Sequence, residues 1–278
     1  MRFRLQNLNY SYGQGGEVVL KNVQLNIPAG AKVAVLGMSG SGKTTLLNIL
    51  GLLASGRRES KTVFYDNGQG VSDYADLSSG QRADFRLNHF GFVLQSAYLL
   101  PNFTCRQNVE LPLVLKGKPV DERADICEKL LKRIEEKSPN GAAGELSTKM
   151  KLRPARLSPG QRQRMAVLRA IIHDPQVVFA DEPFASLDPW NTRIVRQLLL
   201  DWQSGALNPE NPGRRRTLLL VTHNISLASD QFADHFVLLK DGAVIDGDVP
   251  GQPFTEKDLP GGHQQIEAMI SPHEGVAA

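Results

Sequence analysis

Polar and apolar residues alternate along residues 1–30, the pattern of short antiparallel strands that each bury one face. Turn signals at 13–16 and 28–30 separate these strands. A compact apolar run over 32–36 ends in glycines and predicts a buried strand. From Lys43 to about Leu53, apolar residues recur at helical spacing. Strand, glycine-rich turn and helix therefore follow in the order of an α/β phosphate-binding unit.

The rest of the chain continues this mixture of strands and helices. The polar, glycine-rich stretch 54–80 carries no clear pattern, so no element is assigned there. The other predictions are a strand at 90–94, mostly helix over 105–174 with breaks at 139–141 and 153–154, strands at 177–180 and 218–221, a helix at about 193–202, a surface loop at 204–216, and a Pro/Gly-rich tail from 249 to 278 with a short helix near 264–270.

Composition narrows the class of protein without naming a partner. The 278 residues allow one or two domains, and 41% hydrophobic with 22% charged residues is typical of a soluble globular chain. The net charge of +3 is too balanced to indicate nucleic acid or an anionic membrane. No apolar run approaches the ~18 residues of a membrane span, and no apolar signal core follows Met1. We therefore expect a cytosolic chain with reduced Cys105 and Cys127, in which any membrane role comes through another chain.

Residues 37–44 have the P-loop pattern, and they lie between a predicted strand and a predicted helix. Glycines let backbone N–H groups turn toward phosphate oxygens, and the following helix N-terminus adds partial positive charge. In this pattern Lys43 reaches the β- and γ-phosphates and the Thr44 hydroxyl can bind Mg²⁺. The alternative is a plain glycine-rich turn. The predicted nucleotide-binding residues here are Gly37, Ser39, Gly40, Ser41, Gly42, Lys43, Thr44 and Thr45.

Two carboxylates follow the apolar run 177–180, where a P-loop protein needs an acidic partner at a strand end. Asp181 is placed to hold the hydrated Mg²⁺, and Glu182 to orient or deprotonate the attacking water. Upstream, Leu157–Arg164 has the signals of a helix start, with Ser158 as N-cap, Pro159 in the first turn and Gln161 completing a capping box. Such a helix N-terminus can also serve as a second phosphate clamp.

With these motifs the chain resembles the ATP-binding cassette (ABC) family over residues 1–248. The shared features, in family order, are Tyr12, the P-loop, Gln95, a variant of the Leu-Ser-Gly-Gly-Gln signature at 157–161, Asp181–Glu182, Ser186-Leu187-Asp188 and His223. The resemblance implies an α/β P-loop NTPase with a RecA-like core, an N-terminal antiparallel β subdomain and a helical subdomain at about 96–173.

The resemblance also implies a role for each residue. Tyr12 would stack on adenine, and Gln95 would sense Mg²⁺ and the attacking water. His223 would contact the γ-phosphate, beside Glu182 as the base. Thr44, Gln95 and Asp181 would hold Mg²⁺. Ser158, Gly160 and Gln161 of one copy would cap the ATP bound by a second copy, so that two Mg-ATP lie within a homodimer, and Asp188 would communicate across that interface.

Two sequence features complicate this resemblance. Pro159 replaces the usual first glycine of the signature and removes one backbone N–H, which predicts weaker clamping of the γ-phosphate. Residues 77–82, Leu-Ser-Ser-Gly-Gln-Arg, look like a signature but precede Gln95. We interpret them as a loop and a helix start that lead into the strand before Gln95.

The stretch from Phe90 to Leu113 is similar to the lipoprotein-release, macrolide-export and cell-division branch of the family. This similarity implies an ATPase at the cytoplasmic face of the inner membrane that drives integral membrane permease subunits, with no nucleic-acid partner. One alternative is a soluble cassette ATPase of DNA repair or translation. However, a single P-loop without sustained heptads before Asp181 argues against it. A small-molecule P-loop kinase would leave Gln95, residues 157–161 and His223 unexplained.

Overall fold

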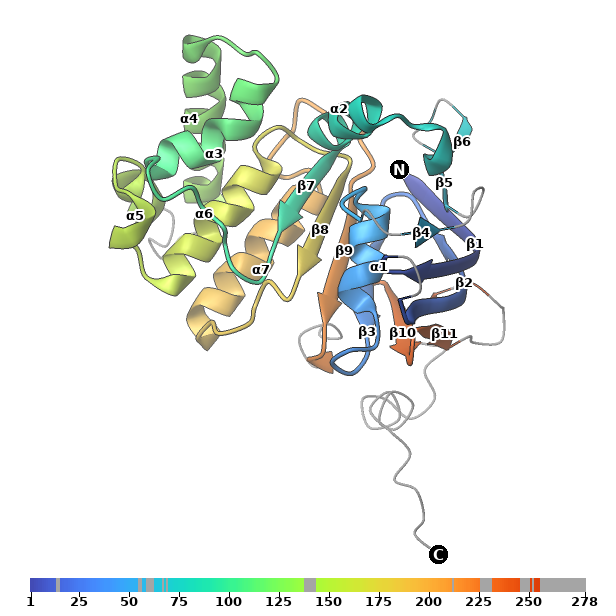
Figure 1. Cartoon of the computed structure of the whole chain (residues 1–278). Helices are drawn as coiled ribbons and strands as arrows, with labels where there is room; N and C mark the ends of the chain where they lie inside the picture. Colours follow the sequence, from blue (N-terminus) through green and yellow to red (C-terminus); the bar gives the residue numbers. More distant parts are fainter. Residues whose placement is uncertain are drawn as a thin grey trace, which may run out of the picture. The chain divides into compact units, whose positions relative to one another are not determined.

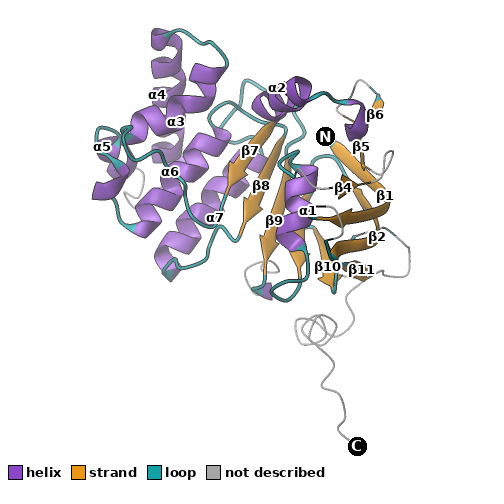
Figure 2. Ribbon diagram, viewed as in Figure 1, coloured by secondary structure: helices purple, strands orange, loops and turns teal. Residues whose placement is uncertain are grey.

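A computed structural model describes residues 1–13, 16–54, 57–58, 63–66, 68, 70–137, 144–211, 213–225, 232–245, 251 and 253–255. The chain forms two compact units, one of residues 1–78 with those from 219 onward, and one of residues 79–218. Figures 1 and 2 show their strands and helices. The short helix predicted near 264–270 and most of the predicted tail lie outside the described residues.

The first unit contains an antiparallel sheet. Its strand order is β2-β1-β5-β6, and β4 also pairs with β1. Side chains of β1 alternate between exposed and buried, as the sequence pattern predicted. The predicted strands of residues 1–30 are thus confirmed. The strands β4, β5 and β6 lie in the stretch 54–80, where the sequence predicted no element. The bounds are β1 (Arg2–Ser11), β2 (Val18–Ile27), β4 (Arg57–Arg58), β5 (Val63–Asp66) and β6 (Val71–Asp73), followed by a 3₁₀ turn at Tyr74–Asp76.

The same unit holds the strands that position the P-loop. Strand β3 (Lys32–Leu36) pairs in parallel with β10 (His235–Lys240), which pairs antiparallel with β11 (Ala243–Ile245) and β12 (Phe254–Thr255). On its other side β3 neighbours β9 (Thr217–Thr222). Helix α1 (Lys43–Leu50) follows β3 through the glycine-rich turn. This confirms the predicted strand, turn and helix, while β10 to β12 were not predicted.

The second unit packs helices around two parallel strands. Strands β7 (Phe90–Val93) and β8 (Val177–Asp181) pair in parallel, and the rings of Phe92 and Phe179 stack with centroids 5.5 Å apart. Helix α6 packs against α3, α7 and β7. The helices are α2 (Ser79–His89), α3 (Cys105–Leu115), α4 (Val120–Lys137), α5 (Gly144–Lys149), α6 (Pro159–Ile171) and α7 (Pro189–Gln203), with a 3₁₀ turn at Pro154–Arg156.

These elements match the sequence predictions for this part of the chain. The predicted break at 153–154 is the 3₁₀ turn, and the one at 139–141 lies outside the described residues. Residues 77–82 form a loop and the start of α2, which leads into β7 and the position of Gln95. The signature-like sequence there is therefore a helix start, as interpreted.

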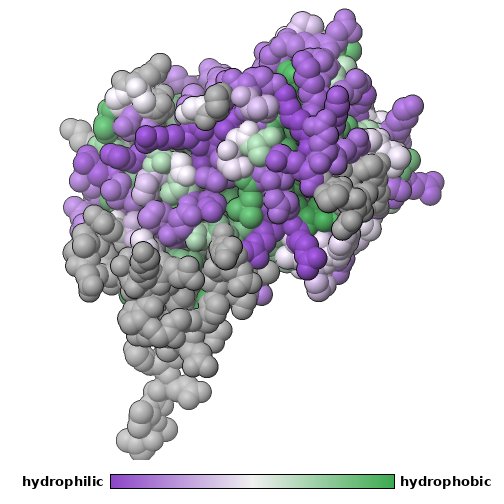
Figure 3. All heavy atoms as spheres, turned by 180° about the vertical axis from the view of Figure 1, so that it is seen from behind, coloured by the Kyte–Doolittle hydropathy of each residue, from purple (hydrophilic) through white to green (hydrophobic). Residues whose placement is uncertain are grey.

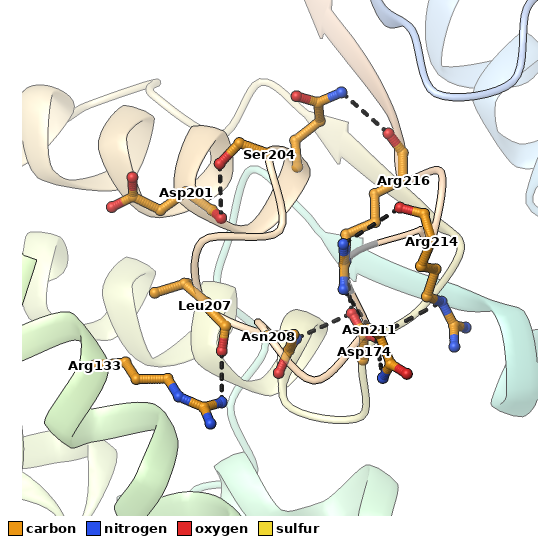
Figure 4. A network of polar contacts seen from close by, with 10 residues as sticks. Arg133, Asp174, Asp201, Ser204, Leu207, Asn208, Asn211, Arg214 and Arg216 are labelled. Atoms are coloured by element: carbon orange, nitrogen blue, oxygen red, sulfur yellow. Dashed lines mark hydrogen bonds and ion pairs between the residues drawn. The ribbon is translucent and has the colours of Figure 1, made fainter.

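The segment 204–216 was predicted as a surface loop, and this prediction is wrong for Arg216, which is only 2% exposed. Figure 4 shows its guanidinium against Asp174, with Nε 2.7 Å from Oδ1 and Nη2 3.1 Å from Oδ2. Asn208 also donates to Asp174, at 3.0 Å. Arg133 of α4 donates to the Leu207 carbonyl at 2.8 Å and pairs with Glu210. The loop thus connects α4 to the turn before β8.

Apolar helices and exposed apolar side chains are the features that would contact a membrane. In the part of the chain that the structure describes, no helix is long and apolar enough to cross a bilayer. The face in Figure 3 is largely hydrophilic, with small separate apolar areas. Exposed large apolar side chains of the second unit include Tyr98, Leu115 and Val120. Single exposed apolar side chains are normal on soluble domains.

Candidate nucleotide-binding site

The turn between β3 and α1 is closely wound and needs glycine. Gly40 and Gly42 have φ values of +82° and +101°, which L side chains rarely adopt. A Cβ at Gly37 would lie 2.2 Å from the Leu239 carbonyl oxygen of β10. Backbone strain and close packing therefore explain the glycines at these positions.

The interior of this turn is polar and suits an anion. Lys43 is 8% exposed, and its ammonium donates to the carbonyl oxygens of Gly37 and Met38, both at 2.8 Å. The Ser41 hydroxyl is buried and has no hydrogen-bond partner among the described residues. In the first turn of α1, Gly42 offers no side-chain cap and no acidic residue is present. A phosphate group matches these donors and this helix N-terminus.

Tyr12 lies beside the P-loop helix in the first unit. Its hydroxyl is 3.1 Å from the Thr45 hydroxyl, and its ring meets Tyr10 edge-on with centroids 5.1 Å apart. The side chain is nevertheless 51% exposed. An aromatic ring fixed at its edge and open on a face can stack on a planar base. His223 belongs to the same unit, follows β9 and is exposed.

The acidic residues belong to the second unit, at the end of β8. Asp181 is the last residue of the strand and is part-exposed. Glu182 has a φ of 44°, and Ser186 in the following turn has a φ of 62°. Such left-handed backbone costs free energy in residues other than glycine, and it recurs at functional sites. Of these two residues, Glu182 is a predicted catalytic residue and Ser186 belongs to the motif at 186–188 that carries the family resemblance.

Asp188 ends this turn and caps α7. Its Oδ1 accepts from the Asn191 N–H at 2.9 Å. Hydrogen bonds from the Asn191 backbone and then the Asn191 side chain lower the pKa of Asp188. The carboxylate is therefore held ionised and in one orientation.

Gln95 lies two residues after the end of β7 and is exposed, at the start of a loop that side chains of α6 contact. Gln163 donates to the Leu94 carbonyl at 3.1 Å. Arg169 donates to the carbonyls of Ala97 and Tyr98, both at 2.8 Å. Two side chains of the signature helix thus fix the backbone around Gln95, and no motif in the sequence marks this role.

Asn108 of α3 holds the far end of the same loop. This fully buried side chain accepts from the Leu100 N–H at 2.7 Å and donates to the Leu100 carbonyl at 3.1 Å. It also donates to the Thr104 carbonyl at 3.0 Å. A buried asparagine that replaces a missing backbone partner in this way orders an irregular loop.

The signature turn forms the predicted capping box at the start of α6. The Ser158 hydroxyl accepts from the Gln161 N–H at 3.2 Å, and the Gln161 side chain accepts from the Ser158 N–H at 2.9 Å. Pro159 occupies the first helical position, where its fixed φ fits the helix. The Ser158 N–H is therefore already bound by the Gln161 side chain.

For Pro159→Gly we expect ATP hydrolysis equal to or faster than wild type, since the backbone N–H at 159 is restored. Glycine in the first turn costs about 0.5–1 kcal/mol, so the melting temperature should fall slightly. Steady-state hydrolysis and a thermal melt measure both effects. A large loss of hydrolysis would show that the proline itself is required.

Comparison with known proteins places these motifs in a family. The model of the ABC transporter family matches residues 20–185, more than half of the chain. The chain belongs to the ABC transporter family. It is 37% identical over 239 residues to the macrolide export ATP-binding/permease protein MacB of Shewanella sp. (strain W3-18-1), covering 85% of this chain and 33% of that protein. MacB of Pasteurella multocida (strain Pm70) is 36% identical, with 87% and 33% covered.

Solved ABC cassettes share the fold. The dimeric structure of a bacterial ABC transporter cassette has a TM-score of 0.71 and 34% identity, covering 88% of this chain and 97% of that one. A dimeric post-hydrolysis state of that cassette, bound to ADP and Pi, gives the same values. The predicted α/β ABC nucleotide-binding fold is thus confirmed.

The macrolide-export similarity predicted from residues 90–113 is also confirmed by these relatives. This ABC chain is a transporter ATPase domain and spans about one third of the length of the curated relatives it matches.

Proposed function

We propose that this ABC chain binds and hydrolyses ATP as the ATPase subunit of a membrane transporter complex. Two copies would close around two Mg-ATP and drive a conformational change in permease subunits, for export or lipoprotein-release-like transmission of force. The polar P-loop interior carries the proposal, with Lys43 buried and the Ser41 hydroxyl without a hydrogen-bond partner in the part of the chain that the structure describes.

The residues predicted from the sequence have these roles in the proposal. The P-loop with Thr45 and Tyr12 binds ATP, while Ser158, Gly160, Gln161 and Asp188 act on the nucleotide of the second copy. Thr44, Asp181 and Gln95 would hold Mg²⁺, which supplies charge neutralisation at the β- and γ-phosphates. Glu182 orients and deprotonates the attacking water, and His223 contacts the γ-phosphate.

The proposed setting is a peripheral subunit at the cytoplasmic face of the inner membrane. The relatives are named as ATP-binding/permease proteins, and this supports integral membrane partners and no nucleic acid. We propose residues 1–248 as the ATPase domain, with a helical subdomain at about 96–173, and 249–278 as a tail. A role in DNA repair or translation is not favoured, since the similar proteins are exporters and the longest described helix between 43 and 181 has 18 residues.

The P-loop is tested by Lys43→Ala, which we expect to weaken Mg-ATP binding at least about tenfold. The variant removes a charge that acts directly on phosphate, a contact of about 1.5–3 kcal/mol. Titration with a fluorescent ATP analogue measures the affinity. Lys129→Ala is the matched control, because Lys129 is an exposed lysine that pairs with Asp125 on α4. Unchanged affinity in Lys43→Ala would contradict the proposal.

A further inference from the structure

Asn191 lies in the first turn of α7 and was not among the predicted site residues. Its backbone N–H donates to Asp188 Oδ1 at 2.9 Å, and its side-chain Nδ2 donates to Asp188 Oδ2 at 2.5 Å. Both oxygens of the carboxylate are therefore held by one residue. This double contact fixes the rotation of the Asp188 carboxylate as well as its position.

The other side of the Asn191 amide meets the signature turn. A Cβ placed on Gly160 would lie 2.2 Å from Asn191 Cγ and 2.4 Å from its Oδ1. Because real Cβ contacts are never this short, only glycine fits at 160 while Asn191 occupies this place. The backbone of the signature helix therefore rests directly on the amide that holds Asp188.

The oxygen of the Asn191 side-chain amide lies in an unfavourable environment. Oδ1 is buried and has no hydrogen-bond partner among the residues that the structure describes. An unsatisfied buried acceptor is unfavourable, so fold stability alone does not account for asparagine here. The hydrogen bond from the same side chain to Asp188 explains why an asparagine occupies this position.

We infer that Asn191 is a positioning residue for ATP hydrolysis, because its amide joins the Asp188 carboxylate to the signature turn at Gly160. The inference rests on the proposed function, in which Asp188 and Gly160 both act at the ATP of a second copy. Asn191 itself touches no nucleotide in this scheme. Its effect is to hold two groups in one geometry, and small displacements of such groups slow a reaction strongly.

The test starts with Asn191→Ala in the full chain, with ATP as the probe. We expect hydrolysis to fall about tenfold or more, while the affinity for Mg-ATP changes less than about twofold, since the P-loop is intact. Gln197→Ala is the matched control, because Gln197 donates to Asp201 at 2.9 Å on the same helix. This second amide–carboxylate pair should be replaceable without loss of hydrolysis.

A double-mutant cycle separates positioning from a general loss of structure. If Asn191 acts through Asp188, then Asp188→Ala with Asn191→Ala is no slower than Asp188→Ala alone, within about twofold. Asn191→Ser serves as a second variant, and rates are compared well below each melting temperature. Wild-type hydrolysis in Asn191→Ala, or losses that multiply in the double variant, would overturn the inference. A wild-type chain that does not hydrolyse ATP would instead overturn the proposed function.

Discussion

Replacing Glu182 with glutamine is expected to abolish ATP turnover and leave ATP binding intact. Glutamine keeps the size of the side chain and its hydrogen-bonding oxygen but cannot accept the proton of the attacking water. Loss of a general base costs about 10²–10⁴-fold in rate. The left-handed backbone at Glu182, with φ of 44°, is retained in the variant, so the local turn should persist. ATP should then accumulate between two copies and trap a dimer.

Phosphate release and light scattering with Mg-ATP measure turnover and dimerisation in this variant. Intrinsic fluorescence gives a further readout, since the two tryptophans differ in exposure, with Trp190 at 50% beside Asp188 and Trp202 at 0%. Closure of the proposed dimer should shift the emission of Trp190. Glu136→Gln is the control, because Glu136 is an exposed glutamate of α4. Wild-type turnover in Glu182→Gln would exclude Glu182 as the base.

Arg216→Met is expected to lower the free energy of unfolding by about 3–5 kcal/mol. Methionine fills much of the same space, but the mostly buried Asp174 carboxylate then loses both hydrogen bonds from the Arg216 guanidinium. Removing one member of a buried ion pair is costly because the other charge stays buried. Arg214, 3.7 Å from Asp174, compensates only in part.

Urea denaturation compares this variant with Arg215→Met, the neighbouring arginine, which is exposed and should be replaceable at little cost. Asp174→Asn with Arg216→Met should be less destabilising than the sum of the single changes, since the charges of both members of the buried pair are then removed. Equal stability of Arg216→Met and Arg215→Met would show that the contact in Figure 4 contributes nothing.

The sequence predicted the parts of the fold that depend on local order along the chain. The P-loop, the strand before it and the helix after it are neighbours in sequence, and glycine spacing with apolar periodicity was enough to predict them. The capping box at Ser158 and a helix start within residues 77–82 were likewise predicted from a few adjacent residues.

Contacts between distant residues could not be predicted in this way. Three consecutive arginines indicate a solvated segment, and nothing near Arg216 in sequence announces Asp174 as its partner. The short strand β5 pairs with β1 and with β6, so the stability of β5 and β6 comes from their partners rather than from their own composition. For β10, the apolar run 236–239 was the available signal.

In the candidate site, too, residues within sequence motifs could be predicted and residues defined by distant contacts could not. Residue types and spacing pointed to Lys43, Asp181 and Glu182, whereas Asn191 and Arg169 emerged only from what they touch. Asn191 was hidden because asparagine in a first helical turn is ordinary and its contact to Gly160 spans two helices. Side chains that hold a site, rather than form it, carry no motif of their own.

The backbone on both sides of Gln95 is bound to α6, since Gln163 donates to the Leu94 carbonyl and Arg169 to the Ala97 carbonyl. Further along the same loop, Asn108 of α3 donates to the Leu100 carbonyl. A loop that is hydrogen-bonded to helices at both ends has little freedom to absorb a displacement within itself. Any shift of Gln95 must therefore be passed on to those two helices. For the same reason, a partner that displaces the exposed ring of Tyr98 would also displace Gln95.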